Sequence, residues 1–180
     1  FRGEALASIA AVTQMEMITR PRGGVSGIHI VKHGGETLSK DEIGCPEGTT
    51  IITRNLFFNA PARLKFLKSS RTETTHINDI VSKLLLAHPE ISFKYISNGK
   101  TIFHSSGNGN NLSAVITIYG KDIIHDILPI EIKNNNIVIS GFLGKPSLSR
   151  FNRNHQSFFV NGRYIKSNLL SKCIEHAYKP

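Results

Sequence analysis

The stretch GTTIITRNLFFNAPARLKFLKS, residues Gly48–Ser69, contains the change of secondary structure from which the fold can be read. Its first part, Thr49–Phe58, is rich in β-branched and aromatic side chains and predicts a strand. Asn59-Ala60-Pro61 breaks that strand, and Arg63–Phe66 predicts a short helical piece. Four basic side chains accompany the break and would either line an anion-rich site or stand in solvent: Arg54, Arg63, Lys65 and Lys68.

Helix and strand patterns occur on both sides of this stretch without strict strand-helix-strand alternation, which predicts two-layer α+β domains with mostly antiparallel sheets. Helices are predicted from apolar residues at helical spacing, and strands from alternation and from Gly-Gly or Asn-Gly turns. The predicted helices are residues 5–12, 72–88, 112–120 and 166–178. The predicted strands and hairpins lie in residues 15–19, 27–38, 91–106, 127–143 and 157–165.

The segment SGNGNN (Ser106–Asn111) is the most linker-like part of the chain, and we place a domain boundary there, between residues 1–108 and 109–180. A chain of 180 residues suffices for one large or two small domains. At this size we expect about 70% of the unfolded chain's surface to be buried on folding.

Composition narrows the classes of protein to consider. With 39% hydrophobic and 19% charged residues, the chain is typical of a globular protein. Lys and Arg outnumber Asp and Glu by 22 to 13, which favours a polyanion partner, although an ordinary basic domain has the same balance. No apolar run approaches the roughly 20 residues that span a bilayer. Cys45 and Cys173 fit no metal-ligand pattern, and we expect two buried free thiols.

The segment FRGEAL (Phe1–Leu6) has the features of a phosphate site seen from its C-terminal side. It combines the free N–H groups of a helix N-terminus, an exposed backbone at Gly3 and the guanidinium of Arg2, all of which favour phosphate. The alternative is a simple turn before a helix, with Glu4 placed favourably for the helix dipole.

The segment FFVNGRYIKS (Phe158–Ser167) places Asn161-Gly162-Arg163 at a strand end, where the arginine could be presented to a phosphate backbone. A turn that carries a surface arginine is the alternative. No Cys/His cluster or HExxH pattern indicates a metal site.

In this order and at these distances, FRGEALASIAAV, GTTIITRNLFFNAPARLKFLKS and FFVNGRYIKSNL resemble the N-terminal region of MutL/PMS-type DNA mismatch repair proteins, which are members of the GHKL ATPase superfamily. The resemblance covers essentially the whole chain. It implies an α+β fold of two two-layer α/β sandwich domains. Residues 1–108 would be the C-terminal part of a GHKL ATPase domain, and residues 109–180 a truncated transducer domain like domain 2 of ribosomal protein S-five.

The resemblance also implies roles for individual residues. The family's ATP lid would end in FRGEAL, with Arg2 and Gly3 near the nucleotide phosphates and Phe1 and Leu6 shaping the lid. Thr49 or its neighbour Thr50 would reach the adenine side through a hydrogen bond. The DNA-binding groove would include Asn161 and Arg163. Asn59, Pro61 and Arg63 are interpreted as mainly structural.

Because the family's general-base glutamate, magnesium-binding asparagine and Asp-x-Gly-x-Gly motif would lie upstream of Phe1, and its phosphate-binding lysine beyond Pro180, no catalytic or metal-binding residue is assigned in this chain. ATP and Mg²⁺ are expected cofactors of the intact protein, whereas the segment alone is expected to bind neither well and not to hydrolyse ATP.

The implied function is ATP-dependent, DNA-binding coupling of mismatch recognition to downstream repair. The implied partners are DNA, a mismatch-recognition protein of MutS type, and a second N-terminal region that forms a homodimer or heterodimer on ATP binding; no membrane is involved. The expected location is the cytoplasm, with the nucleoid in a bacterium, or the nucleus in a eukaryote. The alternative is a non-enzymatic nucleic-acid-binding module without nucleotide chemistry.

Overall fold

The computed structural model describes residues 3–179, and its contacts divide the chain into a first compact unit that ends at Ser69 and a second that begins at Ser70. Both units combine helices with antiparallel strands, which confirms the predicted α+β class. The boundary placed from sequence between residues 108 and 109 lies inside the second unit and stays a prediction.

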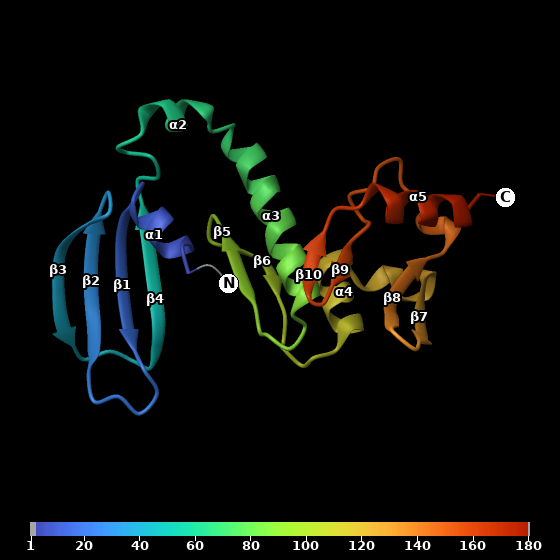
Figure 1. Cartoon of the computed structure of the whole chain (residues 1–180), viewed down its shortest axis with the longest axis horizontal. Coiled ribbons are helices and arrows are strands. Elements are labelled where there is room, and N and C mark those ends of the chain that lie inside the picture. The colour runs from blue at the N-terminus through green and yellow to red at the C-terminus, as the bar shows by residue number, and fades with distance from the viewer. Residues whose placement is uncertain (1–2, 180) are drawn as a thin grey trace. The chain divides into compact units, whose positions relative to one another are not determined.

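The first unit contains a four-stranded antiparallel sheet with the strand order β3-β2-β1-β4 (Figure 1). Its strands are β1 (Gln14–Arg20), β2 (Gly27–His33), β3 (Glu36–Ile43) and β4 (Gly48–Arg54). Helix α1 (Ala5–Ala10) packs against β1, and α2 (Pro61–Phe66) follows β4. The predicted Gly-Gly turn joins β2 to β3 with positive φ at both Gly34 and Gly35, a conformation that favours glycine.

Strand β4 ends at Arg54, so the prediction that it continues to Phe58 is wrong. Asn55 and Phe57 adopt φ angles of 54° and 63°, in the left-handed region, which cannot continue a strand. The Phe57 N–H donates instead to the carbonyl oxygen of Val12 at 2.7 Å. A β-branched and aromatic composition gives no sign of this turn, because the acceptor is far away in the sequence.

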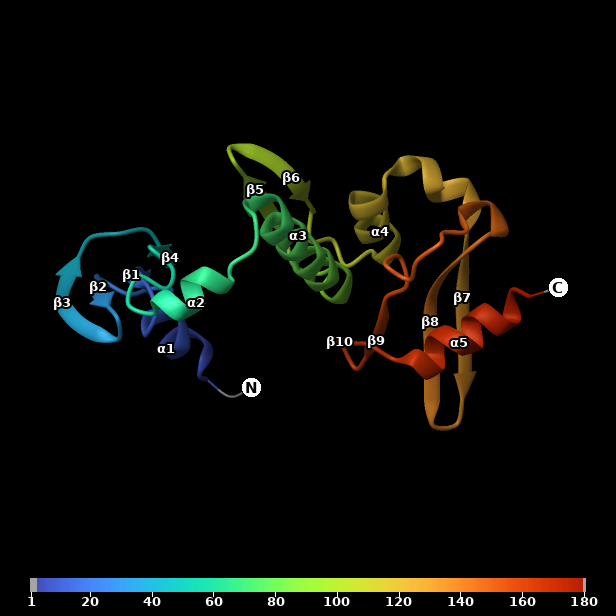
Figure 2. The ribbon, with the colours of Figure 1, turned by 90° about the horizontal axis from the view of Figure 1, so that it is seen from above.

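The second unit contains three two-stranded antiparallel sheets within its described residues. They are the hairpins β5 (Lys94–Ser97) with β6 (Lys100–His104), β7 (Ile127–Asn134) with β8 (Ile137–Gly144), and β9 (Phe158–Val160) with β10 (Arg163–Ile165). The helices are α3 (Ser70–Ala87), α4 (Asn111–Tyr119) and α5 (Asn168–Ala177), with short 3₁₀ turns at Lys121–Asp126 and Pro146–Leu148. Helix α3 packs against α4 and β10 (Figure 2). Within residues 3–179, no helix has the length and apolar character needed to cross a bilayer.

The Asn-Gly turn signals are confirmed in the second unit, whereas the predicted start of its last helix is corrected. Asn98-Gly99 and Asn161-Gly162 both connect strands with positive φ at each residue, as Asn-Gly predicts for a two-residue hairpin turn. The side chain of Ser167 accepts a hydrogen bond from the Leu170 N–H at 3.2 Å, so α5 begins at Asn168 rather than at Lys166.

The segment SGNGNN, predicted to be a linker, is held in place by contacts with neighbouring residues. The Gly109 N–H donates to the Pro89 carbonyl oxygen at 3.0 Å. A Cβ added to Gly107 would lie 2.4 Å from the backbone nitrogen of Ser92, and the φ of Gly107 is +69°. Glycine is therefore required there by close packing as well as by conformation.

The hydrophobic core is smaller than chain length predicts. In the described part of the chain, the buried hydrophobic residues are Ala10, Met15, Leu85 and Ala114. In β8, by contrast, Ile137 and Val138 are each 63% exposed. A two-stranded sheet cannot cover both of its own faces, so apolar residues of the hairpins remain open to solvent. Cys45 and Cys173 are free thiols, as expected, but Cys45 is only half-buried and Cys173 is exposed, which corrects the expectation that both are buried.

Helix α5 is attached to the preceding loop by a two-pronged ion pair. The Arg153 Nε donates to one Glu175 carboxylate oxygen at 2.6 Å, and a second guanidinium nitrogen donates to the other at 2.8 Å. These hydrogen bonds lower the pKa of Glu175 below its usual value. Because the folded-state pKa is depressed, the pair stabilises the attachment above the ordinary carboxyl pKa, and the stabilisation is lost as pH falls through the depressed value.

We therefore expect Glu175→Gln to increase hydrogen exchange in α5 at neutral pH and to remove the loss of protection that the wild type shows on acidification. The measurement is amide exchange of α5 peptides in the full-length protein, corrected for the intrinsic pH dependence of exchange. Glu131→Gln, which breaks the exposed ion pair of Glu131 with Lys133 in β7, is the matched control and should leave α5 unchanged. Equal acid sensitivity in wild type and Glu175→Gln would contradict the assignment.

Candidate functional site

The first candidate site is the amino end of α1. Phe1 and Arg2 lie outside the described residues. Gly3 is exposed with φ at +69°, and Leu6, in the first turn of α1, is 42% exposed. Glu4 occupies the N-cap position, but neither its side chain nor another one caps the helix. Among the described residues, the amino end of α1 thus has an exposed glycine and no side-chain cap.

The carboxyl end of α1, in contrast, is held by several hydrogen bonds. The hydroxyl of Thr13, which is only 2% exposed, donates to the Ile9 carbonyl oxygen at 2.7 Å. The side-chain amide of Asn59 donates to the Ala11 carbonyl oxygen at 2.9 Å, and the Phe57 N–H donates to the carbonyl of Val12. The LFFNAPAR signature is thus connected directly to the helix that FRGEAL begins.

Thr49 and Thr50 lie at the start of β4, both exposed. The Thr49 hydroxyl is 2.8 Å from that of Thr19, its partner across the sheet. The chain passes from α1 into β1 at Gln14, five residues before Thr19, the residue that pairs with Thr49. At the usual rise per residue of a strand, Thr49 therefore lies about 17 Å along the sheet from the start of β1. Within the described residues, no hydrogen bond connects Thr49 or Thr50 to α1, so the structure does not bring these two groups of candidates into contact.

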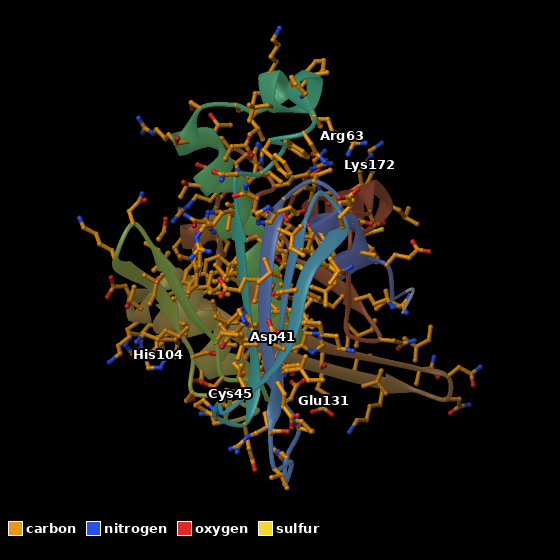
Figure 3. All side chains as sticks on the ribbon, turned by 90° about the vertical axis from the view of Figure 1, so that its left-hand side faces the viewer. Asp41, Cys45, Arg63, His104, Glu131 and Lys172 are labelled. Carbon is orange, nitrogen blue, oxygen red and sulfur yellow. The ribbon has the colours of Figure 1, made fainter. Side chains whose placement is uncertain are left out.

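Arg54, one of the basic side chains near the signature, is paired, which the sequence did not reveal. Arg54 lies 3.4 Å from a Glu16 carboxylate oxygen, and the other oxygen of Glu16 is 3.0 Å from His29 Nε2. These side chains come from three neighbouring strands, β4, β1 and β2, and the only available sequence signal is strand alternation. Arg63 is carried by α2, at the opposite end of the first unit from Cys45 (Figure 3).

The second candidate site is the β9–β10 turn. Asn161 and Gly162 form the turn, with φ angles of 49° and 75°, and Arg163 begins β10 opposite Val160. All three turn residues are exposed, and no ion pair of Arg163 is found in the part of the chain that the structure describes. The guanidinium is therefore available to a solvent-side anion.

A buried lysine, which the sequence gave no reason to select, contacts residues of the β9–β10 hairpin and of the segment before it. Lys83 of α3 is 8% exposed, and its ammonium donates to the Ser157 hydroxyl at 3.0 Å. The same ammonium lies 5.4 Å from the centre of the Tyr164 ring and 3.4 Å from Asp79. Tyr164 is the neighbour of Arg163 in β10, so these contacts fix the strand that carries the arginine.

The sequence is similar to that of known DNA mismatch repair proteins. A family model described as the DNA mismatch repair protein C-terminal domain matches residues 115–180. The DNA mismatch repair protein MutL of Agathobacter rectalis is 49% identical over 179 residues, which cover 99% of this chain and 28% of that protein. MutL of Symbiobacterium thermophilum is 43% identical over 99% of this chain and 28% of its own length. The chain thus spans less than a third of the length of these curated relatives.

The solved structures agree. The MutL ATPase domain of Aquifex aeolicus, determined as a complex with ADP, has a TM-score of 0.81 and 25% identity over 96% of this chain and 67% of that one. The N-terminal domain of a DNA repair protein has a TM-score of 0.81 at 21% identity, covers 99% of this chain and 59% of its own, and supports the fold alone.

The sheet, α1 and the signature therefore have the arrangement of part of a GHKL-type ATPase domain. The chain belongs to the MutL family of DNA mismatch repair proteins.

Proposed function

We propose that this chain is the part of an ATP-dependent, DNA-binding mismatch repair protein that contains the end of the nucleotide lid and part of the DNA-binding groove. The observation that carries the proposal is the match over 96% of the chain, with a TM-score of 0.81, to a MutL ATPase domain that was determined with ADP. The function is to couple mismatch recognition to downstream strand processing, with DNA, a MutS-type protein and a second N-terminal region as partners.

The residues present fit the nucleotide end of such a site. At the amino end of α1, Gly3 has no side chain to obstruct a phosphate, and no side chain caps the helix at Glu4. When bound, ATP supplies a triphosphate whose terminal group can be transferred to water. Gly3 would approach that triphosphate through its backbone, Leu6 would exclude water from it, and Thr49 or Thr50 would hydrogen-bond on the adenine side.

Magnesium has no equivalent support in this segment. Within residues 3–179, no group of three or more His, Cys, Asp or Glu side chains is arranged to hold a metal ion. As the family resemblance implies, we propose binding and orientation for this chain, and general-base and metal-binding roles for the rest of the full-length protein.

The DNA end of the proposal rests on the β9–β10 turn and on net charge. Arg163 is exposed at the tip of a hairpin whose strand is fixed by Lys83 and Tyr164. The chain carries a formal charge of +9, which favours a polyanion partner. Contacts of this kind bind the phosphate backbone without reading sequence, as is needed by a protein that acts wherever a mismatch occurs.

The test is nucleotide binding by the full-length protein. We expect it to bind ATP, and Thr49→Val or Thr50→Val to raise the Kd by about two- to twelvefold, the equivalent of one lost hydrogen bond of about 0.5–1.5 kcal/mol. Thr53→Val, on the same strand but opposite Met15, is the matched control and should leave the Kd unchanged. If the wild type binds DNA but no nucleotide in equilibrium titration, the non-enzymatic nucleic-acid-binding module is the correct interpretation.

A further inference from the structure

The turn between β4 and α2 is held in an uncommon conformation. Asn55 and Phe57 both have positive φ, which asparagine adopts more readily than most residues but an aromatic residue adopts only rarely. The segment forms two successive turns, with the Phe58 N–H donating to the Asn55 carbonyl and the Ala60 N–H to that of Phe57, each at 3.0 Å. Such conformations persist only where the surrounding contacts impose them. Here those contacts come from the end of α1.

Asn59 is the side chain that makes this connection from the signature. Its amide nitrogen donates to the carbonyl oxygen of Ala11, the C-cap residue of α1, whose orphan carbonyl needs a donor. Gly34 leaves room for it, because a Cβ at Gly34 would lie 3.0 Å from that amide nitrogen. The amide thus lies between the end of α1 and the β2–β3 turn, on a residue that stays exposed to solvent.

The same residue stands directly before the basic helix. Ala60 is the N-cap of α2, Pro61 occupies its first turn, and Arg63 and Lys65 lie in its last turn. The hydrogen bond from Asn59 to Ala11 therefore joins the carboxyl end of α1 to the residue that precedes the N-cap of α2. Through this hydrogen bond, a change in the order or position of α1 can be passed directly to α2.

We propose that Asn59 is a positioning residue of the nucleotide lid, which transmits ordering of α1 to the basic helix α2 through its hydrogen bond to the Ala11 carbonyl. This inference rests on the proposed function. It does not require Asn59 to touch the nucleotide, from which α1 separates it. It gives a physical role to the asparagine of the signature, which sequence reasoning interpreted only as structural.

The test is hydrogen exchange of the full-length protein with and without the non-hydrolysable ATP analogue AMPPNP at saturating concentration. In the wild type we expect the analogue to slow exchange in peptides covering both α1 and α2, by about fivefold or more in α2. In Asn59→Ala we expect slowing in α1 but less than about twofold slowing in α2. Asn59→Asp, which keeps the size but replaces the donor with an acceptor, should behave the same way and serves if the alanine variant does not fold.

Thr13→Val is the matched control. It removes a different hydrogen bond at the same end of α1, the one from Thr13 to Ile9, and leaves that of Asn59 in place. We expect α2 to keep its nucleotide-dependent protection in this variant. Persistent α2 protection in both Asn59 variants, or equal loss in Thr13→Val, would overturn the positioning role. Absence of any AMPPNP effect on α1 in the wild type would instead overturn the proposed function, and this inference with it.

Discussion

The isolated 180-residue chain is expected to show no ATP turnover above the uncatalysed rate, with or without Mg²⁺. Hydrolysis requires a positioned general base, which contributes about 10²–10⁴-fold, and a metal ion that stabilises the charge on the transferred group. Within residues 3–179 no carboxylate cluster suited to a metal is present, and Glu4, the acidic residue nearest to the proposed lid, lies at an open helix end. The nucleotide contact proposed above for this segment would not by itself activate water.

The measurement is phosphate release by the purified chain, with the full-length protein as the positive control under the same conditions. Glu4→Gln distinguishes the sources of any residual activity. The contrary result is magnesium-dependent ATP hydrolysis that co-purifies with the wild-type chain and is absent from Glu4→Gln. That result would mean that the chain carries its own general base, and the assignment of that role to the rest of the protein would be wrong.

Arg163→Glu in the full-length protein is expected to weaken DNA binding about tenfold or more at low salt. The substitution removes a charge that can pair with phosphate and places a repelling charge at the tip of the β9–β10 turn. Loss of one phosphate contact should also reduce the slope of log K against log salt by about 1. The weakening should be uniform across DNA sequences, because a phosphate contact does not distinguish bases.

Fluorescence anisotropy with DNA duplexes of unrelated sequence, measured over a series of salt concentrations, gives both quantities. Lys133→Glu makes the same change of charge in β7, where Lys133 already pairs with Glu131, and it should have a much smaller effect. Equal affinity of wild type and Arg163→Glu at low salt would exclude Arg163 from the groove.

Local signals accounted for most of the fold. Asn98-Gly99 and Asn161-Gly162 predicted hairpins because the positive φ of a mirror-image turn is a property of the two residues themselves. The end of β4 was missed because the turn at Phe57 depends on the Val12 carbonyl, which is remote in sequence. The same limit applies to the site. Gly3 and Leu6 could be proposed from their motif, whereas the hydrogen bond from Asn59 to Ala11 could be found only in the folded chain.

Burial was also beyond what the sequence could indicate. Lys83 looks like an ordinary polar position on a long helix, yet it is enclosed by Ser157, Asp79 and the Tyr164 ring. Arg54 looks like a free surface charge, yet it pairs with Glu16. Asp79 lies one turn before Lys83 on the same helix, as helical spacing allows, but Ser157, Tyr164 and Glu16 are brought in by tertiary packing, about which helical periodicity and strand alternation carry no information.

The β7–β8 hairpin has a practical consequence for anyone who prepares this segment by itself. Ile137, Val138 and Ile139 are consecutive in β8 and between 50% and 63% exposed, and among the described residues neither outer edge of this two-stranded sheet pairs with another strand. Open edges with β-branched side chains recruit further strands from other molecules. When produced without the remainder of its polypeptide, the segment is thus inclined to precipitate or form fibrils, and a charged residue in place of Val138 is the simplest remedy.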